Sequence, residues 1–81
     1  MKPNMEINTM NIETPEVEEM ISYLINSYNH GHNPAYSSNA TAYWHQLKDE
    51  RDAEFANEVY DTAWKAFETE RIAFEKAQDN N

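Results

Sequence analysis

Carboxylates are the side chains with the greatest chemical potential in this sequence, and they recur at helical spacing in its second half. With Glu50 placed at zero on a wheel of 100° per residue, they fall between about −20° and 80°. The set comprises Glu50, Glu54, Glu58, Asp61, Glu68, Glu75 and Asp79. Paired carboxylates can exchange protons in catalysis, but only where burial or a close charge shifts a pKa. On an exposed helix they lack that burial, so the pattern favours an electrostatic role.

Other patterns typical of catalysis are absent from the sequence. It has no cysteine, no glycine-rich phosphate loop and no nucleophile motif such as G-x-S-x-G. His30, His32 and His45 could together bind a metal, but their spacing is weak and no cysteine joins them. We therefore expect no metal, no cofactor and no enzymatic activity.

The carboxylate stripe is nearly of one sign, because only Lys65, Ile72 and Lys76 intrude on it. Like charges one turn apart destabilise an isolated helix by roughly 0.2–0.5 kcal/mol per pair, so the arrangement hints at a selected electric field. A helix face with such a field would bind a basic protein surface. The expected contacts are Glu50, Glu54, Glu58, Asp61, Glu68 and Glu75. The alternative is an ordinary solvated outer face of a helix.

The spacing of the stripe limits how closely it can imitate DNA. From Glu50 to Glu75 it covers about 38 Å, or about one carboxylate per 6 Å. Duplex DNA carries one charge per ~1.7 Å of axis and a single strand one per ~3.4 Å. One helix is therefore too sparse to reproduce a duplex, and a dimer would come closer.

Aromatic side chains form a second feature of the same segment, beside an alanine-rich face that allows close helix approach. The expected seam for a partner or a second copy consists of Trp44, Tyr60, Trp64, Phe67 and Phe74. A helix of fifteen residues spans about 22 Å and cannot cover the run from Phe55 to Ala77, which is about 33 Å long. Part of the seam should therefore meet another chain, in a homodimer or a heteromeric complex, unless the N-terminal arm folds back over it.

These features require an all-α fold. Thr14 is a good N-cap, Pro15 suits the first helical position, and Gly31 can end the helix with a positive φ. Apolar residues between them follow the i, i+3, i+4, i+7 pattern of one buried face, so we predict a helix over 15–29. Residues 30–38 read as a loop. Residues 1–13 read as an extended, flexible arm, and 14–81 as a single helical domain.

The segment from 39 to 78 contains neither glycine nor proline, so it can be one long helix or two in tandem. Tyr43, Trp44 and Leu47 fall on nearly the opposite side of the wheel from the later apolar residues. Either the helix breaks or kinks near 48–52, or its two halves bury against different things. Because the run 48–52 is all charge and holds no helix breaker, we predict a continuous or gently kinked helix that forms a hairpin with the first.

Composition narrows the class of partner. The chain has 81 residues and a net charge of −9, from fifteen acids against six bases. That charge disfavours direct binding to nucleic acid or to an anionic membrane and favours a basic protein, although solubility alone could also explain it. No apolar run follows Lys2, and no stretch approaches the ~20 apolar residues of a membrane span, so we expect a cytoplasmic protein.

In general character (short, acidic, helical, without cysteine or a catalytic set) the chain is similar to small virus-encoded inhibitors of host defence or transcription machinery, some of which mimic DNA. The resemblance is one of composition and carries over no residue. It implies a phage-encoded inhibitor or regulator that acts in the host-cell cytoplasm on a nucleic-acid-handling protein. The alternative is a structural or assembly component, or an accessory subunit, that binds through the aromatic seam.

Overall fold

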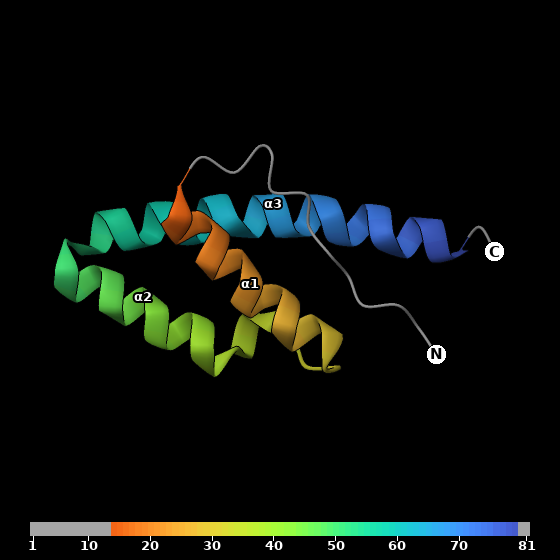
Figure 1. Cartoon of the computed structure of the whole chain (residues 1–81), viewed down its shortest axis with the longest axis horizontal. Coiled ribbons are helices and arrows are strands. Elements are labelled where there is room, and N and C mark those ends of the chain that lie inside the picture. The colour runs from red at the N-terminus through yellow and green to blue at the C-terminus, as the bar shows by residue number, and fades with distance from the viewer. Residues whose placement is uncertain (1–13, 80–81) are drawn as a thin grey trace.

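The computed structural model describes residues 14–79, and in this part of the chain every regular element is a helix. The elements are α1 (Pro15–Asn29), the short 3-10 helix η2 (Pro34–Tyr36), α2 (Ser38–Glu50) and α3 (Ala53–Asp79). Figure 1 shows α2 and α3 running side by side in opposite directions, with α1 crossing them obliquely. The prediction of an all-α fold is confirmed. The arm expected at 1–13 lies outside the described residues.

Helix α1 has the bounds that the sequence predicts, because its ends are set by local side-chain chemistry. The Thr14 hydroxyl accepts a hydrogen bond from the Val17 N–H at 3.2 Å, and Pro15 occupies the first turn. At the other end, the N–H of His30 still reaches the Asn26 carbonyl oxygen at 3.2 Å. Gly31 then turns the chain with φ at 80°, a conformation that disfavours any side chain.

The continuous or gently kinked helix predicted over 39–78 is wrong, and the alternative of a break near 48–52 is what the structure shows, because the chain reverses between α2 and α3. Arg51 leaves the helical conformation, with φ −132° and ψ −85°, although its N–H still bonds the Leu47 carbonyl oxygen at 2.9 Å. Asp52 then starts the next helix, because its Oδ1 accepts a hydrogen bond from the Phe55 N–H at 2.7 Å. The all-charged run therefore contains its own start signal, and no glycine or proline is needed.

This reversal brings the two opposed apolar patterns onto one core. Tyr43 and Leu47 of α2 are buried in one core with apolar residues of α1 and α3. The core consists of Val17, Met20, Ile21, Leu24, Ala40, Tyr43, Leu47, Ala56, Val59, Ala63 and Phe67. A continuous helix would have left Tyr43 and Leu47 on the far side from Phe67. Burial of such side chains contributes roughly 1.5–3 kcal/mol each, which favours the reversal.

Helices α1 and α2 together cover most of the apolar side of α3, so the uncovered length is smaller than the sequence suggests. Figure 1 shows the C-terminal end of α3 projecting beyond both other helices. On that end Ala73 and Ala77 are exposed and Ile72 is 55% exposed. A cover by α1 alone would leave a long open seam, and α2 shortens it because it folds back along α3 as a separate helix.

We expect Asp52→Ala to lower the free energy of unfolding by about 1 kcal/mol, because it removes the cap of α3 and leaves the Phe55 N–H without its acceptor. Urea denaturation followed by circular dichroism measures this. Asp49→Ala is the matched control: it removes the same charge from an exposed position in the last turn of α2. Equal losses in the two variants would contradict a capping role for Asp52.

Candidate functional site

Four of the expected contact carboxylates share the outward side of α3. Glu54, Glu58, Asp61 and Glu68 are exposed, and we call these four residues the acidic face. They lie opposite the buried Ala56, Val59, Ala63 and Phe67, because residues of a helix advance by about 100° each. The helix therefore turns one side to the core and a row of four carboxylates, interrupted by the exposed Lys65, to solvent.

Few of the protein's own cations neutralise these carboxylates. Within residues 14–79 the one ion pair joins Arg71 to Glu75, with 3.1 Å between Arg71 Nη1 and Glu75 Oε2. The Arg51 guanidinium instead lies 4.1 Å from the centroid of the Phe55 ring, and the Lys48 ammonium 5.8 Å from that of Trp44. The acidic face thus has no ion-pair partner in the described part of the chain, and its field reaches solvent.

The other two expected carboxylates are placed differently. Glu75 accepts hydrogen bonds from the Tyr28 hydroxyl at 2.8 Å and from Arg71, and both lower the pKa of its carboxyl group. It fastens the end of α1 to α3. Glu50 belongs to the last turn of α2 and accepts a hydrogen bond from Gln46 Nε2 at 3.3 Å. The break at 51–52 removes Glu50 from the α3 row. Asp79 has no described side chain.

The structure divides the expected aromatic seam. Phe67 is fully buried in the core, so it is not one of the exposed contacts that the sequence predicts. Trp44 lies on α2, and its Nε1 donates a hydrogen bond to Asn57 Oδ1 at 3.0 Å, which joins α2 to α3. Tyr60, Trp64 and Phe74 are half-buried along α3. These three lie on one helix and keep surface that a partner could contact, as does the half-buried Trp44 on α2.

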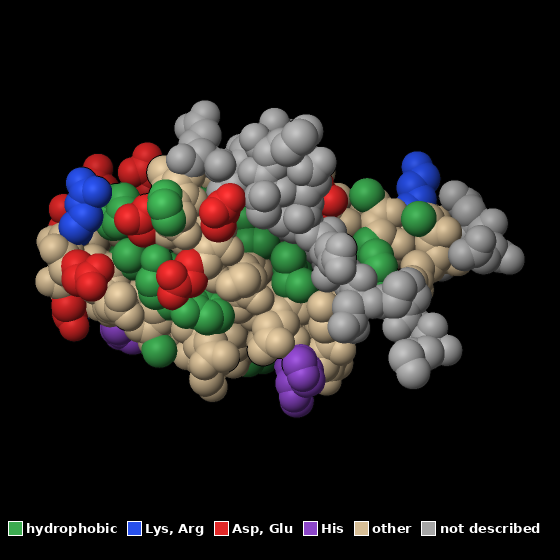
Figure 2. Space-filling view, viewed as in Figure 1, with side chains coloured by type: hydrophobic (Ala, Val, Ile, Leu, Met, Phe, Trp, Pro, Cys, Tyr) green, Lys and Arg blue, Asp and Glu red, His purple; other side chains and the backbone are tan. Residues whose placement is uncertain are grey.

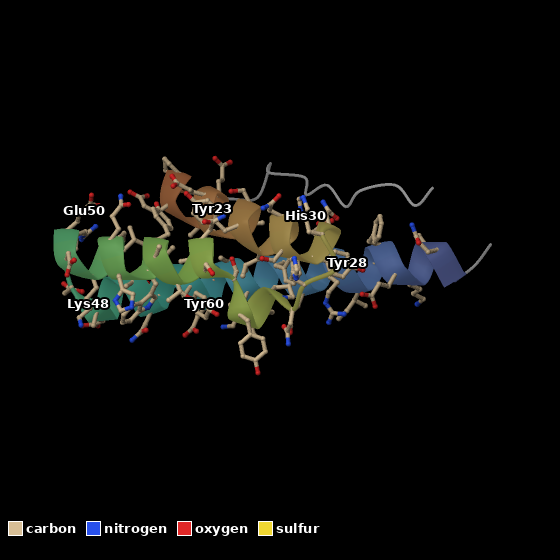
Figure 3. All side chains as sticks on the ribbon, turned by 90° about the horizontal axis from the view of Figure 1, so that it is seen from below. Tyr23, Tyr28, His30, Lys48, Glu50 and Tyr60 are labelled. Atoms are coloured by element: carbon tan, nitrogen blue, oxygen red, sulfur yellow. The ribbon has the colours of Figure 1, made fainter. Side chains whose placement is uncertain are left out.

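A second acidic region was missed by sequence reasoning. The pKa of Tyr43 is raised to about 12, chiefly by burial and in addition by the nearby carboxylates of Glu19, Glu16 and Glu50. Tyr23 donates its hydroxyl hydrogen to Glu19 and lies edge-on to Tyr43, with ring centroids 5.6 Å apart. Figure 3 labels Tyr23 on α1 and Glu50 at the end of α2.

These carboxylates come from helix ends about thirty positions apart in the sequence, and only the tertiary fold brings them together. In Figure 2 the acidic side chains gather over the end of the molecule where α2 passes into α3. Spacing along one helix could not have revealed this grouping, since its members lie on different helices.

The histidines do not converge. His30 and His32 border a polar depression of about 560 Å³ at the α1–η2–α2 loop, and His30 Nδ1 lies 2.7 Å from the Asn26 carbonyl oxygen. His45 is on α2, where its ring stands edge-on to Trp44 at 5.1 Å. Within residues 14–79, no three side chains of metal-binding type are grouped to hold an ion.

Among the helices of residues 14–79, none combines the length and the apolar character that a membrane span requires. Comparison of the chain with protein-family models, with curated proteins and with solved structures finds no match. No relative therefore supplies an activity, and function must be inferred from the chain's own side chains.

The buried Tyr43 gives the fold a pH dependence in the alkaline range. Its folded pKa of about 12 exceeds the ordinary tyrosine value, so its contribution to stability is complete below pH 10 and is lost as the pH rises toward 12. By pH 11 this loss is about 1 kcal/mol. We expect Tyr43→Phe to lack it, so that the variant gains stability relative to the wild type between pH 8.5 and 11.

Urea denaturation at the two pH values measures this difference. Tyr36→Phe is the control, because Tyr36 is 82% exposed and the variant loses a tyrosine hydroxyl that lies outside the core. A Tyr43→Phe variant that loses stability with pH as steeply as Tyr36→Phe would contradict this account of the Tyr43 environment.

Proposed function

We propose that this protein is a non-catalytic inhibitor or regulator that places its acidic face on the basic surface of a nucleic-acid-handling protein. The observation that carries the proposal is the row formed by Glu54, Glu58, Asp61 and Glu68, exposed on one side of one helix without ion-pair partners among the described residues. A basic groove that binds phosphates would supply positively charged side chains to pair with these carboxylates, which have no such partner within the described part of their own chain.

The spacing of the acidic face favours imitation of the negative charge of nucleic acid rather than of the positions of its phosphates. Glu54 and Glu68 are fourteen residues apart, which corresponds to about 21 Å along α3. Four carboxylates over that length are about one per 7 Å, whereas a single strand has one phosphate per ~3.4 Å. The acidic face would therefore compete with nucleic acid through its field, as a loose DNA mimic, without matching phosphates one by one.

The biological setting belongs to the same proposal. The compositional likeness to virus-encoded inhibitors of host machinery supports a phage origin and a role in host-defence evasion, with action in the host-cell cytoplasm. The net charge of −9 supports a protein partner over direct contact with nucleic acid or with an anionic membrane. Half-buried Tyr60 and Trp64, on the same helix as the acidic face, would add desolvated contact at its margin.

Affinity purification from the native host at 50 mM salt, followed by mass spectrometry, tests the proposal. We expect capture of a nucleic-acid-binding protein that is released at 500 mM salt, because exposed charge pairs are screened within about 8 Å at physiological ionic strength and within less at higher salt. The double variant Glu54→Gln with Glu58→Gln should lose most of that capture. Glu18→Gln with Asp49→Asn removes the same charge from exposed positions outside the acidic face and should retain it.

A captured partner that resists 500 mM salt, or equal losses in the two double variants, would contradict docking through the acidic face. Circular dichroism of each variant separates loss of binding from loss of fold.

The projecting end of α3 favours a second candidate, a component that assembles with another chain. Ile72 is 55% exposed there, and Ala73 and Ala77 are exposed beside it. In this case Ile72→Glu should change the sedimentation coefficient or the captured partner, while the Glu54→Gln, Glu58→Gln variant should change neither. The reverse ranking would support the acidic face.

A further inference from the structure

A cleft lined by aromatic rings lies beside the acidic face, between the end of α1, η2 and α3. Its volume is about 290 Å³, and its walls include Tyr28, Pro34 and Trp64. Phe67 forms the base, since it is fully buried and lines the same cleft. The Tyr28 and Trp64 rings both stand edge-on to Phe67, with centroids at 6.0 Å and 5.4 Å.

This arrangement holds the walls of the cleft in place. Tyr28 is fixed at its far end by its hydroxyl bond to Glu75, and Figure 3 shows it where the end of α1 meets α3. Trp64 is held by Tyr60 on one side, at 6.2 Å between ring centroids, and by Phe67 on the other. A side chain that enters the cleft would therefore meet rings already ordered before binding, which reduces the entropy lost on binding.

Two charged side chains also line the cleft, and they differ in whether they have an ion-pair partner within the protein. Arg71 is already bound to Glu75 at 3.1 Å. Glu68 is exposed and has no ion-pair partner among residues 14–79. Glu68 is also one end of the acidic face, so the cleft opens next to a row of negative charge. The uncompensated charge at the cleft is therefore a carboxylate.

We infer that this cleft receives an arginine side chain of the basic partner, with the guanidinium against the Trp64 and Tyr28 rings and hydrogen-bonded to Glu68. A guanidinium is planar, stacks on aromatic faces and pairs with a carboxylate through two parallel N–H···O hydrogen bonds. It can therefore pack on the aromatic walls of the cleft and neutralise the Glu68 carboxylate at the same time. A lysine ammonium is more strongly hydrated and would use the rings less. The inference rests on the proposed function, because it supplies the residue that anchors that partner.

Two-dimensional ¹H–¹⁵N NMR of the full chain with the peptide N-acetyl-Gly-Arg-Gly-amide tests the inference. The indole N–H of Trp64 reports on the cleft, and that of Trp44, bonded to Asn57 outside the cleft, is the internal control. We expect a saturable shift of the Trp64 signal and no comparable shift of Trp44. The same peptide with citrulline in place of arginine should have no effect, because citrulline has the same shape without the charge.

Substitutions test whether Glu68 is the carboxylate that the arginine peptide contacts. Glu68→Gln should weaken the peptide's effect on Trp64 by about two- to fivefold, the range expected for loss of an exposed ion pair. Glu18→Gln, with the same change of net charge on α1, should leave it unaltered. Equal shifts with the citrulline peptide, equal shifts of both indoles, or no effect of Glu68→Gln would each overturn the arginine site.

Failure of this inference is distinguishable from failure of the proposed function. If Trp64 does not respond while Glu54→Gln with Glu58→Gln still abolishes partner capture, the arginine site is overturned and the acidic face stands. If that double variant also captures its partner normally, the acidic face is overturned as well.

Discussion

The reversal of the chain at Arg51 and Asp52 is the constraint on which the rest of the structure depends. It is held at its base by the Asp52 cap on Phe55 and higher up by the hydrogen bond from Trp44 to Asn57. Because α2 folds back along α3, the apolar sides of both helices face α1 and close a core in a chain without cysteine. Without the reversal, the two apolar sides would point in opposite directions and each would need a different cover.

The same reversal determines what faces outward. Once the core side of α3 is occupied by α1 and α2, its opposite side is exposed, and that side holds Glu54, Glu58, Asp61 and Glu68. Solvation of four neighbouring carboxylates is inexpensive in water, but it leaves a field that a basic surface can neutralise. The fold thus separates the residues that hold the molecule together from those proposed to contact another one, while Trp64 lies at the boundary between them.

Local signals were enough to predict part of the fold. The bounds of α1 follow from Thr14, Pro15 and Gly31, each of which acts through its immediate neighbours. The boundary between α2 and α3 could not be predicted in this way, because an aspartate within a charged run fits a helix surface as well as an N-cap. The opposed apolar phases of Leu47 and Phe67 were the better indication, and weighting them above the absence of glycine and proline would have predicted two helices.

The candidate site was predictable to the extent that it lies on one helix. The carboxylates of the acidic face were found from spacing alone, whereas Glu75 and Phe67 have structural roles that depend on contacts with Tyr28 of α1. The grouping of Glu16, Glu19 and Glu50 around Tyr43 depends on three-dimensional proximity and has no counterpart in helical spacing.

The most direct test of the account is a nuclear Overhauser effect between the Trp44 indole N–H and the Asn57 side chain. The reversal places these groups in hydrogen-bond contact at 3.0 Å and predicts a strong effect. A continuous helix would separate residues 44 and 57 by about 20 Å, so absence of the effect, together with unbroken helical contacts through 50–53, would contradict the account.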